Sequence, residues 1–152
     1  MAVNKLLHSK PFDIIPPAIK SGDTYFFTTD SGLEYEVRFG RHEDIGIRFV
    51  NFGIINDDVE DEYMVTNKGE IYRIMATIVA IILLYDKQTI YVTDYEFIGE
   101  YKSDSKEVET SIRTKLYYRI ADRILDKSKW KIFLNGNKLI VRKLDSLSHD
   151  KL

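Results

Sequence analysis

Apolar and charged residues alternate along the segment from Leu33 to Phe39, where every second residue is apolar. This period of two is typical of a strand that buries one face. A short run of aromatic residues and threonines, 25–29, predicts a strand before it, and the turn-forming residues 30–32 between the two segments predict a β-hairpin. A run rich in β-branched and aromatic residues, 45–54, predicts another strand.

Three further patterns predict the remaining strands. Residues 63–65 suit a short strand or bridge, and residues 89–98 suit a longer strand. Nearer the C-terminus, apolar residues on both sides of Asn135-Gly136 predict a second hairpin over 130–141. Asn-Gly suits the centre of a two-residue turn because both residues accept a positive φ.

Residues 71–85 are apolar at almost every position, which predicts a long, buried helix. Asn67 stands three residues before Glu70, the spacing of a helix-capping box. At about 100° per residue, the side chains of Glu70, Arg73 and Thr77 form one narrow polar stripe. Such a helix has to be covered on nearly every side, so we expect it to pack centrally on the sheet.

A second helix is predicted over 109–126. Its apolar residues recur every four positions and define one buried stripe, made of Ile112, Leu116, Ile120 and Ile124 and widened by Tyr117 and Ala121. Two helices and about five to seven strands predict an α+β fold, with a mainly antiparallel twisted sheet and the more hydrophobic first helix innermost.

The 152 residues are expected to form one domain. Residues 1–23 carry all three prolines without clear periodicity, which predicts an extended N-terminal arm. The single α+β domain then spans 24–145, and the polar residues 146–152 are expected to fray as a C-terminal tail.

Composition excludes several classes of protein. The 22 Lys and Arg residues against 24 Asp and Glu residues exclude a strongly basic, histone-like binder and a wholly acidic disordered chain. Without cysteine there is no disulfide, thiol nucleophile or thiolate metal site. The three His residues lie far apart in sequence, so we predict no metal site and no cofactor.

The sequence shows neither a signal peptide nor a membrane span. The N-terminus lacks a sustained apolar region, and the strongest apolar run, 74–85, is shorter than the roughly twenty residues that a span needs. We therefore expect a cytoplasmic protein without a membrane partner.

Arg113 has the most unusual position in the second helix, because it projects between Ile120 and Ile124 on the apolar face. A buried guanidinium needs an anionic partner, since burying an unpaired charge is costly. Two partners fit: the carboxylate of Glu70, or an anionic ligand group in a pocket between the helices. The internal pair is the simpler interpretation, and near the helix start Arg113 could also reach solvent.

Arg119 and Arg123 flank the apolar face of the same helix, whereas Lys115 and Tyr118 point outward. Basic and aromatic side chains together suit phosphate contact and base stacking. With the interleaved aspartates, they are also typical of an ordinary solvated helix. Nucleic-acid binding is therefore the alternative function rather than the first.

The sequence contains no motif of a nucleophilic or phosphate-binding active site. His42 beside Glu43 and Asp44 is a weak acid–base candidate, so we expect no enzyme. The acidic segment 57–62 could hold a hard cation but lacks the EF-hand pattern, and we interpret it as a charged loop.

Aromatic residues are numerous, with ten Tyr and eight Phe, and most of them are expected to fill the core. Tyr25, Tyr95 and Tyr101 are the candidates for exposed partner anchors.

Two segments resemble a family of small proteins from tailed phages and some bacteria. They are VTNKGE (65–70) leading into MATIV (75–79), and RTKLYYR (113–119). In that family a T-x-x-G-[DE]…ATV helix start precedes an R-x-x-L-Y-x-R helix, and the similarity spans roughly residues 24–125. The resemblance implies phage origin and a single constellation of Gly69, Glu70, Arg113, Tyr117 and Arg119, but no known activity, substrate or cofactor.

We therefore expect a non-enzymatic interaction protein that binds a host or viral macromolecule, first of all a protein, through its sheet edge or aromatic loops. If it is phage-encoded, it acts in the host cytoplasm. The alternative is a nucleotide or nucleic-acid binding module whose Arg-rich helix contacts phosphate. The candidate binding residues are Arg113, Tyr117, Arg119, Arg123 and Glu70, with no catalytic residue among them.

Overall fold

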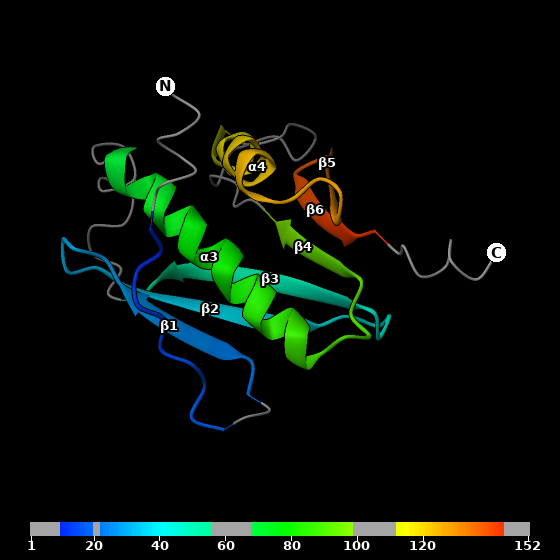
Figure 1. Cartoon of the computed structure of the whole chain (residues 1–152), viewed down its shortest axis with the longest axis horizontal. Helices are drawn as coiled ribbons and strands as arrows, with labels where there is room; N and C mark the ends of the chain where they lie inside the picture. The colour runs from blue at the N-terminus through cyan, green and yellow to red at the C-terminus, as the bar shows by residue number, and fades with distance from the viewer. Residues whose placement is uncertain (1–9, 20–21, 56–67, 99–111, 145–152) are drawn as a thin grey trace, which may run out of the picture.

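Six strands form one sheet in the computed structural model, which describes residues 10–19, 22–55, 68–98 and 112–144. The strands are β1 (Thr24–Thr28), β2 (Glu34–Arg41), β3 (Ile47–Ile54), β4 (Asp94–Ile98), β5 (Trp130–Asn135) and β6 (Lys138–Lys143). Their order is β1-β2-β3-β4-β6-β5, and only β3 and β4 pair in parallel (Figure 1). The predicted α+β fold with a mainly antiparallel sheet is confirmed.

Two helices, α3 (Lys68–Gln88) and α4 (Ile112–Ile124), pack on the same face of the sheet (Figure 1). Helix α3 connects β3 to β4, as a parallel pair of strands requires a crossover rather than a tight turn. Helix α4 leads into the hairpin of β5 and β6. The other face of the sheet carries neither α3 nor α4, and we call it the helix-free face.

The period of two along β2 decides which residues meet α3. Tyr35, Val37 and Phe39 are buried in the core, whereas the alternating charged residues lie on the helix-free face. On its sheet-facing side, α3 contributes to the core side chains that are at most 1% exposed, among them Ile74, Ile78, Ile81 and Ile82. The central position predicted for the hydrophobic helix is confirmed.

Two side chains of the polar stripe of α3, Arg73 and Thr77, contact the N-terminal segment 10–19. The Thr77 hydroxyl accepts a hydrogen bond from the backbone N–H of Phe12 at 2.8 Å. Arg73 donates from Nε to the carbonyl of Lys10 at 2.9 Å, and its guanidinium lies 3.9 Å from the centre of the Phe12 ring. Further along, Ile15 bridges to Phe26, so this segment occupies part of the outer edge of β1.

The hairpin of β5 and β6 turns one residue later than the Asn-Gly pattern predicts. Asn135 pairs with Lys138, so the two turn residues are Gly136 and Asn137. Gly136 has φ of 65°, and no described residue other than glycine has a positive φ. This pattern fits a turn in which only the first central residue needs that conformation, and glycine adopts it without a steric penalty.

Several predicted boundaries also differ from the structure. The strand predicted over 45–54 begins at Ile47, and the one predicted over 89–98 begins at Asp94, because the preceding residues form turns. The predicted bridge 63–65 and the acidic segment 57–62 lie outside the described residues. In the described part of the chain, neither helix has the length and apolar character needed to cross a bilayer.

Candidate functional site

Helix α4 presents a row of three exposed cations, Lys115, Arg119 and Arg123, which we call the basic row. Their four-residue spacing places them on one side of the helix, about 6 Å apart along its axis. None of them forms an ion pair or hydrogen bond with a described residue. Like charges at this spacing repel one another by a few tenths of a kcal/mol, so an external anion would stabilise the row.

The opposite side of α4 anchors the basic row to the fold. Tyr117, Ile120 and Ala121 are buried, and the Tyr117 ring lies 5.0 Å from the ring of Phe52 on β3. The sequence places Tyr117 both on the buried stripe of this helix and among the candidate binding residues, and in the structure it packs in the core. Its burial fixes the rotation of α4 and therefore directs the basic row toward solvent.

The two carboxylates in and directly after α4, Asp122 and Asp126, have other partners. Asp122 pairs with Lys127 at 3.1 Å. Asp126 accepts hydrogen bonds from the hydroxyl of Ser128 at 2.7 Å and from its backbone N–H at 2.9 Å, and these bonds lower the pKa of Asp126. The aspartates that made α4 resemble an ordinary solvated helix thus leave the row without a carboxylate partner among the described residues.

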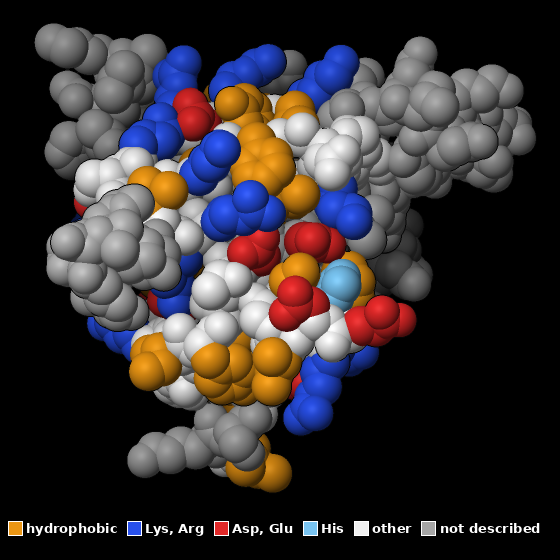
Figure 2. Space-filling view, turned by 90° about the vertical axis from the view of Figure 1, so that its right-hand side faces the viewer, with side chains coloured by type: hydrophobic (Ala, Val, Ile, Leu, Met, Phe, Trp, Pro, Cys, Tyr) orange, Lys and Arg blue, Asp and Glu red, His pale blue; other side chains and the backbone are white. Residues whose placement is uncertain are grey.

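The basic row belongs to a larger basic region of the chain. Residues 112–144, which form α4, β5 and β6, contain ten Lys and Arg residues but only two Asp and no Glu. We call this unit the basic lobe. In Figure 2 several Lys and Arg side chains gather near the top of the visible face, at the height where Figure 1 places these elements. The small net charge of −2 conceals this asymmetry, which a count along the chain could have found.

The pair proposed between Arg113 and Glu70 lies outside the described side chains. Arg113 belongs to α4, but nothing beyond its backbone is described. Glu70 lies in the first turn of α3 and accepts hydrogen bonds from the hydroxyl of Ser31 at 2.9 Å and from its backbone N–H at 3.2 Å. Through these hydrogen bonds, Glu70 links the β1–β2 turn to the first turn of α3.

A buried arginine that sequence reasoning missed is Arg48 on β3, which is only 7% exposed. Its guanidinium donates to the hydroxyls of Tyr85 at 2.9 Å and Tyr91 at 3.2 Å, and to the carbonyls of Ile45 at 2.9 Å and Ile47 at 3.0 Å. The sequence pattern could have indicated this burial, because the alternation of faces along β3 places Arg48 on the same side as Val50, which is buried. All four acceptors are formally neutral.

Arg48 joins two loops that expose apolar side chains. Ile45, in the β2–β3 turn, is 72% exposed, and Ile90 and Tyr91, in the α3–β4 connection, are 78% and 53% exposed. We call these three residues the loop patch. Exposed aliphatic and aromatic side chains on adjoining loops are typical of a protein contact surface.

Two of the three predicted aromatic anchors are wrong. Tyr25 is 2% exposed and Tyr95 is fully buried, because both side chains point into the core beneath α3. The Tyr95 hydroxyl donates to Asp86 at 2.8 Å, and burial together with this bond raises the pKa of Tyr95. Tyr101 lies outside the described residues.

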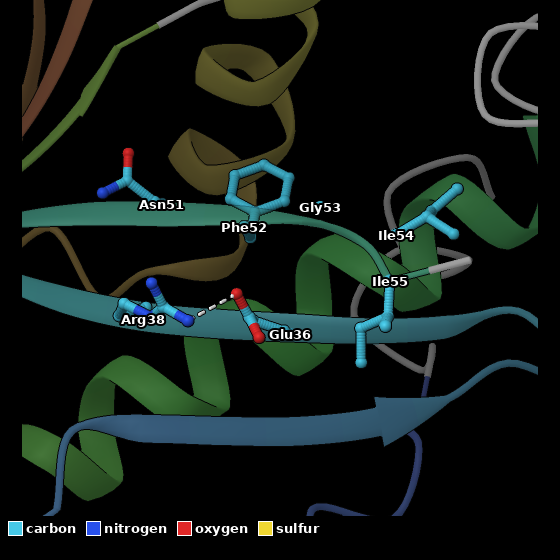
Figure 3. Close-up of a pocket in the computed structure, with 7 residues that line it drawn as sticks. All are labelled: Glu36, Arg38, Asn51, Phe52, Gly53, Ile54 and Ile55. Carbon is cyan, nitrogen blue, oxygen red and sulfur yellow. Dashed lines mark ion pairs between the residues drawn. The ribbon is translucent and has the colours of Figure 1, made fainter. Parts of the chain in front are cut away.

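The helix-free face has a hollow of about 480 Å³ beside Gly53, where a side chain is missing from β3 (Figure 3). Arg38 at its rim pairs with Glu36 at 3.1 Å. Across the same face, Arg142 pairs with Asp94 at 2.8 Å and Lys138 with Glu96 at 3.4 Å. These cations are already neutralised, so the hollow is a poorer anion site than α4.

Comparison with known proteins gives no relative: the chain matches no family model, no curated protein and no solved structure. The resemblance to phage and bacterial proteins, and with it the phage origin, stays a prediction. Among the described residues no three His, Asp or Glu side chains come together as metal ligands.

Proposed function

We propose that the protein binds nucleic acid through the basic row of α4. The observation that supports this proposal is that Lys115, Arg119 and Arg123 are exposed, aligned and without a carboxylate partner among the described residues. Nucleic acid is the polyanion whose regularly spaced phosphates suit such a row. Contacts of this kind hold the backbone and carry no sequence information, so the binding would be insensitive to base sequence.

The proposal predicts a specific dependence on salt. Each phosphate that a cation neutralises releases a counterion, so three contacts give a slope of log K against log salt of about −3 for duplex and about −2 for single strands. Fluorescence anisotropy with labelled homopolymer and mixed-sequence oligonucleotides, from about 50 to about 300 mM NaCl, measures this slope.

The decisive variant is the triple substitution K115Q/R119Q/R123Q. A matched control, K10Q/R41Q/K87Q, changes the net charge equally but removes exposed cations outside the basic lobe. We expect the first variant to lose at least tenfold in affinity at low salt and the second to bind nearly as the wild type does. Equal losses in both, or no binding by the wild-type protein at low salt, would contradict the proposal.

A second candidate function, binding of a host or viral protein, is supported by the loop patch. Arg48 holds the two loops together, and the side chains of Ile45, Ile90 and Tyr91 remain largely exposed. Large exposed apolar side chains are costly for solubility, which favours a contact role.

The loop patch is tested by replacing Tyr91 with a photo-crosslinking phenylalanine analogue in producing cells. We expect one discrete adduct that disappears in an I45S/I90S background. The same analogue at the half-buried Tyr118 on α4 serves as the control position. Adducts of equal pattern at both positions would contradict this candidate, and the cytoplasmic location stays a prediction beside it.

A further inference from the structure

The two outer edges of the sheet differ. The edge of β1 is partly occupied, because Ile15 exchanges backbone hydrogen bonds of 2.8 and 3.0 Å with Phe26. Strand β5 at the other edge pairs only with β6 among the described strands. An edge strand with unpaired backbone groups is a ready template for another strand.

The hairpin geometry shows which backbone groups of β5 face outward. Asn135 and Lys138 close a two-residue turn and therefore form a hydrogen-bonded pair. Alternation along the strand then directs the N–H and C=O of Ile132 and Leu134 away from β6. The same alternation explains why the N–H of Trp130 bonds to the carbonyl of Asp126 at 3.0 Å instead of to β6. Ile132 and Leu134 form no hydrogen bond on this edge with any residue in the described ranges.

The side chains of β5 are complementary to a second, antiparallel copy of the same strand. With Phe133 opposite Phe133 of the other copy, Ile132 lies opposite Leu134 and Lys131 lies opposite Asn135. Apolar side chains thus meet apolar side chains, and each Lys131 cation meets the neutral amide of an Asn135 instead of another cation. The two Lys131 residues stand four positions apart, about 14 Å, which limits their repulsion.

We infer that the protein self-associates through β5, so that two copies form one continuous sheet about a two-fold axis at Phe133. Ile132 and Leu134 of each copy exchange four backbone hydrogen bonds across the axis. The contact is isologous, so it closes as a dimer and does not propagate into a filament. It also brings the two basic lobes together, which predicts that salt strengthens the dimer by screening their repulsion.

Sedimentation of the full-length protein measures this association. The interface is small, so the weight-average mass is expected to rise from 17.8 kDa toward twice that value between about 10 and about 500 µM, and to rise further at higher salt. A mass that stays at the monomer value over this range would overturn the inference. Nucleic-acid binding weakens with salt, so the two properties are separable.

Charge exchange at Phe133 tests the register. Phe133→Glu and Phe133→Lys each place like charges face to face, and each variant alone is expected to be monomeric. Their equimolar mixture is expected to restore the dimer, because opposite charges then meet across the axis. Phe26→Glu, at a half-buried phenylalanine of β1 on the same helix-free face, is the control and is expected to retain the dimer.

Two results would exclude β5 as the contact, provided that the variants are folded. Circular dichroism and a thermal melt first show that each variant is folded. If the folded Phe133 variants dimerise as the wild type does, or if their mixture stays monomeric, β5 is not the contact.

Discussion

Arg48 donates a 2.9 Å hydrogen bond from Nε to the hydroxyl oxygen of Tyr85, which joins the first residues of β3 to the last turns of α3. The same guanidinium reaches the carbonyl of Ile45 and the hydroxyl of Tyr91. A planar donor with five N–H groups can satisfy several acceptors at once, whereas an ammonium group on a flexible stem cannot hold the same directions. Arg48 therefore fixes the end of the sheet where the loop patch lies.

Arg48→Lys is expected to destabilise the protein by about 2 kcal/mol, because it keeps a buried charge and leaves acceptors unmatched. Urea denaturation followed by circular dichroism measures the loss. Arg41→Lys is the matched control, since Arg41 pairs with Arg48 across β2 and β3 but is exposed. Similar midpoints for both variants would show that the hydrogen bonds of Arg48 contribute little.

The buried phenol of Tyr95 is expected to make the free energy of unfolding decrease at alkaline pH. Burial, the hydrogen bond to Asp86 and the charge of Asp86 raise its pKa above the usual 10.0. The folded protein therefore keeps the phenol proton at pH values where the unfolded chain loses it. This contribution to stability is complete below pH 10 and declines above it, by up to about 1.4 kcal/mol per pH unit.

Tyr95→Phe is expected to make this alkaline decline shallower, at the expense of about 1 kcal/mol at neutral pH from the lost hydrogen bond. Unfolding free energies between about pH 8 and pH 11 give the slope. Tyr118→Phe, at a half-buried position of α4, should leave the slope unchanged. Parallel profiles for wild type and Tyr95→Phe would mean that the Tyr95 phenol does not control this loss.

Gly136→Ala is expected to destabilise the protein by about 1 kcal/mol, because φ of 65° is unfavourable for any residue with a Cβ atom. Gly53→Ala is the control. A Cβ at Gly53 would meet no atom within 4 Å, and its φ is not positive. That variant should keep or slightly raise the melting temperature. Equal effects of the two substitutions would argue against backbone strain as the cause.

Thr77→Val is expected to loosen the N-terminal segment 10–19. Valine has nearly the shape of threonine but cannot accept the hydrogen bond from the Phe12 N–H, which would be left unpaired in a buried place. The expected loss is about 1 to 2 kcal/mol. Amide exchange at Phe12 should accelerate in this variant and not in Thr28→Val, whose hydroxyl is on the exposed end of β1.

The hydrophobic pattern along the chain predicted those elements whose own sequence determines which side is buried. Leu33 to Phe39 had to become a strand with one buried face, and an apolar helix such as α3 had to lie under cover. The β5–β6 hairpin was also predicted, but its turn was placed one residue early. Both Asn-Gly and Gly-Asn supply a residue that accepts positive φ, and the register depends on how β6 packs.

The three-dimensional structure decided which charges and aromatic rings are available to a partner. Helical periodicity placed Lys115 outward and Arg119 and Arg123 on the flank of the apolar face. That all three are exposed, and that no carboxylate of a described residue meets them, depends on how the chain packs around α4. Tyr91 and Tyr95 share one face of the strand predicted over 89–98, yet Tyr91 is exposed and Tyr95 is buried, because Tyr91 lies in the turn before β4. Periodicity assigns a face to each residue, but only the folded chain determines where β4 begins and which face of the sheet α3 covers.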